Sequence, residues 1–454
     1  MNRRQKGVAR PIGAGLGVLL SLAASACAQT RAPEGISDGG ETGAASTTGT
    51  PGTGSATGST SSAEESSEGG VEPPRYDVGV IPDAPTGECG GTGGGPAFSF
   101  IWIANSSEGT ISKIDTITME EVGRYRTGPG TWEDPSRTSV SLNGNVAVAN
   151  RNGGVASFYA RVEDCVDRNG NGSIDTSTGS NDVLPWDDEE CRAWYAPFDY
   201  ESQRPVAWAP GVFNPSTCSY SDEKLWTSGS AGWSGMPKPK PKLEPGGDGE
   251  VDVILIDGQT GDVDEIVTVP GVPFDGFGLY GGAVDGDGNF WGSQLGSGKL
   301  VRVNRDTFEP TVWNMGASGY GMTVDHQGNV WVCGYEVGRF DPQTETWQTA
   351  SVGGSGGCME DGQGTLWLAS DPLVGVDIET LEVVESINLP SYVHGVSVDF
   401  QGNVWGVTMM ESQAFRVNPA SGEVDTFTGL TGPYTYSDMT GFALANAGGW
   451  APAG

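Results

Sequence analysis

The sequence predicts an all-β protein: a seven-bladed β-propeller, closed by the C-terminal strand, that follows a signal peptide and a disordered linker. A glycine-rich unit recurs about every 40 residues, and most copies carry one tryptophan at the same place. Glycine accounts for 73 of the 454 residues, and no apolar stripe with helical spacing accompanies the repeats. Repeats of this length, built from short strands and tight turns, are typical of propeller blades.

The N-terminus has the layout of a secretory signal. Four cations and no acid lie within residues 1–10, an apolar stretch too short to span a bilayer follows at 12–24, and small residues precede Cys27. This arrangement resembles a bacterial lipobox, whose cysteine is acylated, although Ala24 replaces the usual leucine. Residues 1–27 are therefore expected to be a lipoprotein signal peptide with an acylated Cys27. An ordinary cleaved signal is the alternative.

Residues 28–88 are predicted to be a disordered tether rich in Gly, Ser and Thr. Residues 32–72 contain no Lys, Arg or aromatic side chain, so they cannot bury enough apolar surface to offset the entropy of ordering. A tether of about 40 residues reaches roughly 30–40 Å. Because Ala28 is not the aspartate typical of inner-membrane retention, we expect a lipid-anchored protein of the outer membrane or cell surface.

The balance of charges argues against some classes of partner. The whole chain has a formal charge of −34, and without the four cations of the signal it keeps 20 basic and 58 acidic residues, a charge of −38. Such a chain is unsuited to binding nucleic acid or anionic membrane surfaces. The charge is compatible with divalent cations, with cationic partners or simply with solubility.

The repeat is clearest in the C-terminal half of the chain. Residues 281–291 align without gaps with 321–331, and 357–367 and 395–405 fit the same template, Gly-x-x-x-Asp-x-x-Gly-Asn-x-Trp, with one Thr for the Asn. The template predicts an inner strand, a hairpin turn in which Gly and Asn accept positive φ, and a second strand that starts at the tryptophan. Two further strands complete each predicted blade.

Degenerate copies extend the array to seven blades. One copy keeps Gly-Asn-Val but has Ser141 for the aspartate and Ala147 for the tryptophan. Trp102 and Trp226 each mark the second strand of another blade. The first blade lacks an inner strand, and we expect Gly441–Leu444 to supply it, because a paired chain end leaves no open sheet edge.

The template units, together with Phe-Asp-Pro at 340–342 and Val-Asn-Pro at 417–419, resemble the streptogramin lyase (virginiamycin B lyase-like) propeller family, with kinship to NHL-type repeats. The resemblance covers roughly residues 99–450, and we assign residues 89–454 to one propeller, expected to be monomeric. The matching residues belong to the scaffold, so the resemblance implies the fold and not an activity.

A long insertion is expected at about 161–222, and it contains a calcium-loop motif. Thr178 stands where an EF-hand loop has its last acid, which residues 187–190 are expected to supply instead. The sequence predicts a structural Ca²⁺ site, and an Asn/Gly-rich turn that binds no metal is the alternative. The predicted ligands, at alternate positions of the loop, are Asp167, Asn169, Asn171, Ser173 (through its carbonyl) and Asp175.

A second insertion, at about 232–248, alternates proline and lysine and cannot pair as a strand. We expect an exposed loop there, with a docking segment as the alternative.

Six cysteines remain beyond Cys27, an even number that suggests disulfides in an exported protein. Sequence alone leaves the pairing open. The map of repeats favours Cys165–Cys191 within the first insertion and Cys333–Cys358 between neighbouring blades, with Cys89–Cys218 left by elimination.

The segments that lead into the predicted inner strands gather at one mouth of the channel, and they are rich in aromatic residues. Such a concave mouth is a candidate ligand site, unless the tyrosines merely cap the blade ends. Its residues are Trp132, Asp134, Arg137, Asp275, Tyr280, Tyr320, Tyr392, His394, Tyr434, Tyr436 and Asp438.

His394 is the candidate for catalysis. The resemblance implies a catalytic histidine just before an inner-strand glycine, as His394 is, but lyases add a second histidine and two glutamates where this chain has Gly356, Tyr392 and Met409. An elimination needs a base and a cation, and without those carboxylates a Mg²⁺ ion lacks its expected ligands. The other histidine, His326, is expected to be a solvated turn residue.

The sequence therefore favours a membrane-anchored propeller that binds a protein, a glycan or a small molecule at the mouth. One alternative is a lyase-like enzyme, or another hydrolase, that uses His394 at the same mouth, with Mg²⁺ if it is a lyase. A structural envelope protein with no ligand is the other.

Overall fold

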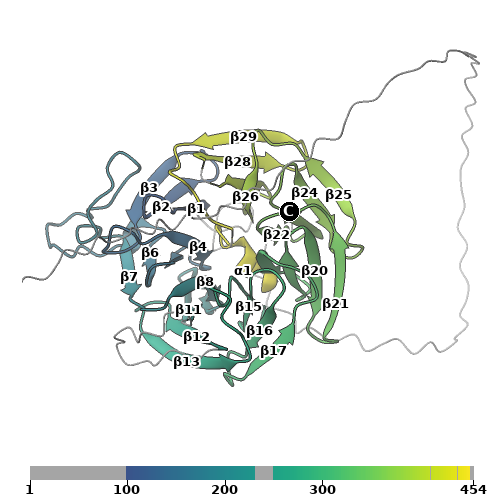
Figure 1. The fold of residues 1–454 in the computed structure, drawn as a ribbon. Helices are drawn as coiled ribbons and strands as arrows, with labels where there is room; N and C mark the ends of the chain where they lie inside the picture. Colours follow the sequence, from purple (N-terminus) through teal and green to yellow (C-terminus); the bar gives the residue numbers. More distant parts are fainter. Residues whose placement is uncertain (1–98, 231–248, 410, 437, 450–454) are drawn as a thin grey trace, which may run out of the picture. The chain divides into compact units, whose positions relative to one another are not determined.

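A computed structural model describes residues 99–230, 249–409, 411–436 and 438–449 as a ring of seven antiparallel sheets with one short helix near the centre (Figure 1). The expected signal peptide, Cys27, the tether, Cys89 and the Pro/Lys loop lie outside these residues. Within them, no helix has the length and apolar character that crossing a membrane requires. The predicted seven-bladed, nearly all-β fold is confirmed.

The strands of each blade pair in chain order from the channel outward. The first three blades are β1 (Phe100–Asn105), β2 (Thr110–Asp115) and β3 (Glu121–Arg126); β4 (Pro135–Val140), β5 (Val146–Asn150), β6 (Val155–Phe158) and β7 (Arg192–Ala196); and β8 (Ser202–Ala209), β11 (Lys224–Ser230), β12 (Glu250–Asp257) and β13 (Val263–Pro270). A small hairpin, β9 (Val212–Asn214) and β10 (Ser219–Ser221), separates β8 from β11.

The last four blades follow the template without interruption. They are β14 (Gly281–Val284), β15 (Phe290–Ser293), β16 (Lys299–Val303) and β17 (Pro310–Asn314); β18 (Gly321–Val324), β19 (Val330–Cys333), β20 (Glu336–Asp341) and β21 (Thr346–Ser351); β22 (Cys358–Glu360), β23 (Thr365–Leu368), β24 (Leu373–Asp377) and β25 (Val383–Ile387); and β26 (Val393–Val398), β27 (Val404–Thr408), β28 (Gln413–Asn418) and β29 (Glu423–Thr428).

The apolar core is divided among the joints between blades. Seven clusters of buried side chains lie in the described residues, one between each pair of neighbouring blades around the ring. The repeat tryptophans are almost completely buried in them, as predicted. Since a single sheet cannot bury both of its faces alone, each blade depends on its two neighbours for stability.

The recurring aspartate and tryptophan of the template are hydrogen-bonded to each other. The indole nitrogen of Trp331 donates to Asp325 Oδ2 at 2.8 Å, while Asp325 Oδ1 accepts the backbone N–H groups of Gln327 and Asn329. The same indole–carboxylate bond, at 2.8–3.0 Å, recurs at Trp291, Trp367 and Trp405. One carboxylate thus ties the hairpin turn to the core.

The degenerate second blade lacks both partners of this bond. Ser141 has no carboxylate to reach across to an indole, and Ala147 has no indole. Trp194 of β7 and Trp208 of β8 pack in the same cluster as Ala147 and supply the missing volume. The side chains of Trp194 and Trp208 therefore compensate for the tryptophan that this blade lacks at Ala147.

The chain end closes the ring, but not through Gly441–Leu444, and that part of the prediction is wrong. The extended residues before it pair with β1: Tyr434 N donates to Ala104 O at 3.1 Å, and Trp102 N donates to Met439 O at 2.8 Å. Gly441 has a φ of 86° and precedes helix α1 (Phe442–Ala447). The Asp438 carboxylate accepts the N–H groups of residues 440 and 441, and this turn ends the extended path.

The stretch 161–222, expected as one insertion, contains two strands of the propeller. Residues 161–191 form a loop with one 3₁₀ turn (Val162–Asp164), but β7 and β8 follow it as the outer strand of the second blade and the inner strand of the third. These two strands were not recognised in the sequence because neither follows the template.

Two of the predicted disulfides are present. Cys165–Cys191 closes the insertion loop, and Cys333–Cys358 joins β19 to β22 of the next blade, with Cα–Cα distances of 4.6 and 6.2 Å. The predicted partner of Cys218, Cys89, lies outside the described residues.

Candidate functional site

The mouth of the channel is formed where the inner strands begin. Tyr280 and Tyr320 immediately precede β14 and β18, and their N–H groups still pair with the second strands, to Ser293 O at 2.7 Å and Cys333 O at 2.6 Å. His394 lies in β26. Because the inner strands of a propeller run in the same direction, equivalent positions in different blades converge around the channel.

Three tyrosine hydroxyls meet at this end of the channel. Tyr280 OH lies 2.9 Å from both Tyr320 OH and Tyr434 OH, and the last two hydroxyls also contact each other. Tyr434 comes from the chain end that closes the ring, so the fourth blade, the fifth blade and the C-terminal segment contribute one hydroxyl each. We call these three side chains, with His394, the mouth cluster.

His394 is buried, with 5% of its surface exposed, and both ring nitrogens have tyrosine partners. Nε2 lies 2.9 Å from Tyr320 OH, and Nδ1 lies 2.9 Å from Tyr392 OH. Burial, followed by the charge of Arg137, lowers the pKa of His394 to about 4. At neutral pH the imidazole is therefore uncharged, with one nitrogen donating and the other accepting.

Arg137 lies beneath the mouth cluster. Its Nε and Nη2 donate to the carbonyl of Tyr280 at 3.1 and 2.7 Å, and its guanidinium stacks on the ring of Tyr436. Tyr436 is itself 1% exposed and stacks on Tyr280, with ring centroids 5.7 Å apart. These two predicted mouth residues form a buried layer under the hydroxyls.

Two further arginines of the mouth were missed from sequence. Arg204, in β8, has its guanidinium carbon 4.8 Å from the ring centroid of Tyr280, and Arg151 lies 4.7 Å from that of Tyr434. Arg151 also pairs with Asp134, a predicted mouth residue. Arg204 was missed because its strand was counted within the insertion; the apolar run that follows it, 205–209, was the available signal.

Three of the predicted mouth residues do not join the cluster. Trp132 is 82% exposed, and Asp275 accepts the N–H groups of residues 277 and 278 in a local turn. Asp438 caps the turn before α1, and burial raises its pKa to about 6. Their positions in sequence place them near the inner strands, but local turn chemistry decides where the side chains point.

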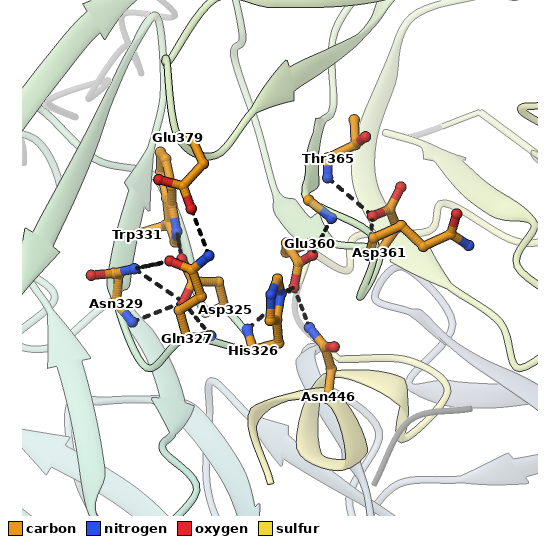
Figure 2. Close-up of polar contacts among 12 residues, drawn as sticks. Asp325, His326, Gln327, Asn329, Trp331, Glu360, Asp361, Thr365, Glu379 and Asn446 are labelled. Carbon is orange, nitrogen blue, oxygen red and sulfur yellow. Dashed lines mark hydrogen bonds and ion pairs between the residues drawn. The ribbon is translucent and has the colours of Figure 1, made fainter. Parts of the chain in front are cut away.

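The other end of the channel is closed by α1. Figure 2 shows Asn446 of α1 donating to Glu360, whose carboxylate also lies 3.2 Å from His326 Nδ1 and accepts the N–H of Gly364. Glu360 is buried at a position where the other template blades have valine. His326 therefore has a buried acidic partner and is not simply the solvated turn residue that was expected.

Among the residues that the structure describes, side chains fill most of the channel between the mouth cluster and α1. A cavity of about 30 Å³ remains, lined by inner-strand residues such as Met322, Thr323 and Met359. This volume suffices for one or two water molecules. A ligand at this end must therefore contact the outer side of the mouth cluster and not the channel interior.

The calcium-loop motif adopts a tight, self-bonded turn. Asp167 accepts the N–H groups of Gly170 and Gly172 at 2.7 and 2.9 Å, and the amides of Asn169 and Asn171 both contact Asp175 Oδ2, at 2.7 and 2.8 Å. Thus positions 3, 5 and 9 of the loop converge on one point. In the part of the chain that the structure describes, no three His, Cys, Asp or Glu side chains are grouped as a metal site.

Of the acids expected to complete the loop, Glu190 and Glu189 are in contact with it, and Glu190 contacts the part that holds the predicted ligands. Its carboxylate accepts the N–H groups of Arg168, Asn169 and Asp175, at 2.8–3.1 Å. The neighbouring Glu189 instead binds Thr176 and Ser177. The disulfide of Cys191, next to Glu190, is consistent with this placement.

Comparisons with solved structures find other proteins similar to this chain. Virginiamycin B lyase from Staphylococcus aureus is 12% identical, with a TM-score of 0.44, over 66% of this chain and 87% of that one. A functionally unknown protein from Desulfotomaculum acetoxidans is 11% identical (TM-score 0.47, 74% and 97%), and AztD from Citrobacter koseri is 12% identical (TM-score 0.44, 75% and 97%). No family model and no curated protein matches the sequence.

Proposed function

We propose that this chain is a lipid-anchored binding protein that recognises a protein, glycan or small-molecule ligand on the outer side of the mouth cluster. The observation that carries the proposal is the convergence of three tyrosine hydroxyls and His394, from different blades, at one end of a channel whose other end α1 closes. Aromatic side chains with polar tips offer both apolar contact and oriented hydrogen bonds.

The enzyme alternative is less well supported by the geometry of His394. A general base needs an accepting nitrogen within reach of the proton that it abstracts, and a pKa near the working pH. Both nitrogens of His394 are occupied by tyrosines, and its pKa is about 4. A lyase reaction would also need a second histidine and carboxylates for Mg²⁺, and the positions concerned hold Gly356, Tyr392 and Met409.

The calcium site remains part of the proposal, with a structural role. Rotating an Asn amide by half a turn exchanges its oxygen and nitrogen, so Asn169 and Asn171 are able to present oxygens to the point where they meet Asp175. Oxygen donors of this kind suit Ca²⁺, which would order the loop of residues 161–191.

The anchor supports a function at a surface. An acylated Cys27 and the tether that follows would hold the propeller away from the outer membrane or cell surface, leaving the mouth free to meet a partner. This part of the proposal rests on the sequence of residues 1–88.

The test is capture of a ligand from the cell envelope. The mature chain, with Cys27→Ser to keep it in solution, is immobilised and exposed to envelope extract, and the retained proteins, glycans and small molecules are compared with those retained by Tyr320→Phe. Loss of one hydroxyl from the mouth cluster is expected to weaken capture about tenfold. Tyr220→Phe, a change in the β9–β10 hairpin away from the mouth cluster, serves as the control. Equal capture by all three chains would contradict the proposal.

A further inference from the structure

Arg137 is buried without a charged partner. It is 1% exposed, and its Nη1 has no hydrogen-bond partner in the part of the chain that the structure describes. Its other two nitrogens donate to a neutral carbonyl, that of Tyr280. A guanidinium removed from water and left without an anion is costly, and proteins usually pair it.

Arg204 shares this situation at the same ring. The guanidinium carbons of Arg137 and Arg204 both lie 4.8 Å from the ring centroid of Tyr280, and Arg204 Nε is also buried without a partner among the described residues. Neither arginine takes part in any ion pair found in the described ranges. The nearby Asp134 is already paired with Arg151.

This concentration of positive charge is unusual in a chain with a net charge of −34. With 58 acids and 24 bases, acidic partners for arginines are abundant elsewhere in the molecule. At physiological ionic strength, exposed charges farther than roughly 8–10 Å are screened, so three arginines against the one carboxylate of Asp134 make the potential at the mouth positive. Burial, and to a smaller extent repulsion from Arg204, lowers the pKa of Arg137 to about 9. Arg137 therefore stays charged at neutral pH.

The surrounding groups are hydrogen-bond donors. Burial raises the pKa values of Tyr280 and Tyr320, so their hydroxyls keep their protons. Phe277 packs edge-on against Tyr280, with ring centroids 5.4 Å apart, and lies under Arg204 at 4.7 Å. The mouth thus combines guanidinium and hydroxyl donors with a flat apolar wall.

We infer that the mouth selects ligands that carry an anionic oxygen group, a carboxylate or a phosphate, on an apolar body. Arg204, which is partly exposed, makes the direct contact, and Arg137 supplies the charge beneath it. Guanidinium forks match the oxygens of both groups, and tyrosine hydroxyls add neutral donors. This inference rests on the proposed function and names the class of ligand for the same site.

The experiment uses matched probes on the mature Cys27→Ser chain. Calorimetric titrations compare benzoate and phenyl phosphate with uncharged benzamide, which has the same ring. The anionic probe that fits is expected to bind at least about tenfold more tightly than benzamide, since a charge-assisted hydrogen bond is lost in the amide. The stronger of the two anions identifies the group as carboxylate or phosphate.

Variants then locate the contact. Arg204→Gln is expected to reduce the affinity for the anion to about that for benzamide, and Arg204→Lys should retain part of the preference for the anion. Arg416→Gln is the control, because Arg416 pairs with Asp425 on the outer strands of the last blade. Circular dichroism confirms that each variant is folded, and the comparison of probes on the unmodified mouth does not depend on any variant.

The failures are distinguishable. Two results would overturn the inference about anions and leave the proposed function standing. In the first, benzamide binds as tightly as both anions. In the second, none of the probes binds at millimolar concentration, while envelope capture still requires Tyr320. If envelope capture is also indifferent to Tyr320, the proposed function falls with it.

Discussion

Burial decides the charge of His394. In an unfolded chain a histidine has a pKa of about 6.5, whereas in the folded mouth cluster burial and Arg137 lower it to about 4. The same imidazole that looked catalytic in sequence is therefore a neutral link between two tyrosines. Its hydrogen bonds connect Tyr392 at the rim with Tyr320 inside.

This shift predicts a specific dependence of stability on pH. Between pH 6.5 and about 4, unfolded His394 binds a proton that the folded protein does not, so the free energy of unfolding falls as the pH falls, by up to about 3 kcal/mol, and levels off below pH 4. The measurement is urea unfolding from pH 7 to 4 for the native chain and for His394→Gln, which keeps a donor and an acceptor for the tyrosines. The loss should appear as a difference between the two chains, because other groups, such as Asp438, are common to both. An imidazole that titrates near 6.5 by NMR would refute it.

At the scale of an element, the loop of residues 161–191 shows how side chains substitute for regular structure. Carboxylates of Asp167, Asp182, Glu189 and Glu190 accept backbone N–H groups along the loop, and the disulfide closes its ends. A buried or turn-forming N–H without such a partner would be unfavourable. The loop is thus held by its own carboxylates and by the disulfide.

Calcium is expected to add stability to this organised loop. At about 100 times its Kd, Ca²⁺ should stabilise the folded loop by about 3 kcal/mol, and a chelator should remove the effect. Calorimetric titration measures binding, and limited proteolysis of residues 161–191 measures the protection. Asp175→Asn should abolish both, whereas Asp164→Asn, whose carboxylate pairs with Arg161 before the motif, should leave Ca²⁺ binding intact. Failure of the native chain to bind Ca²⁺ would leave the motif as a simple turn.

At the scale of the whole molecule, closure depends on the chain end. The last blade and the first meet in a buried cluster that contains Ile103, Trp405 and Met439, and Pro433, Tyr434 and Met439 pair with the inner edge of β1. The next residues form α1, which contacts the inner strands β18, β22 and β26. One segment therefore closes the ring and also blocks the channel.

Removal of this segment is expected to be severe. A chain that ends at residue 432 loses the buried side chains of Met439, Phe442 and Leu444 and leaves the inner edge of β1 unpaired, at a cost of at least about 5 kcal/mol, comparable with the whole stability of a domain. Urea unfolding and size-exclusion chromatography should show a loss of cooperativity and association through the open edge. A chain that ends at residue 449, which keeps the described contacts, is the control. Similar unfolding of the two chains would show that the ring does not need this closure.

The sequence by itself determined the repeating unit. The spacing of Asp, Gly and Trp is a local property, because one carboxylate reaches both its own turn and an indole six residues on, and hairpin pairing carries the pattern through each blade. The number of blades, the burial of the tryptophans and two disulfides could be predicted for this reason. The aromatic mouth was also predicted in outline, from the positions that precede inner strands.

Features that depend on packing between distant parts of the chain were decided only by the tertiary structure. Strands β7 and β8 lack the template and are recognised by their neighbours in the ring, so Arg204 was not predicted as part of the mouth. The closing segment ends after Met439 because the turn capped by Asp438 competes with strand pairing there, and the outcome depends on the contacts of α1 inside the channel. The charge state of His394 and the unpaired charge of Arg137 likewise follow from burial by side chains far apart in sequence, and burial of that kind has no local signature.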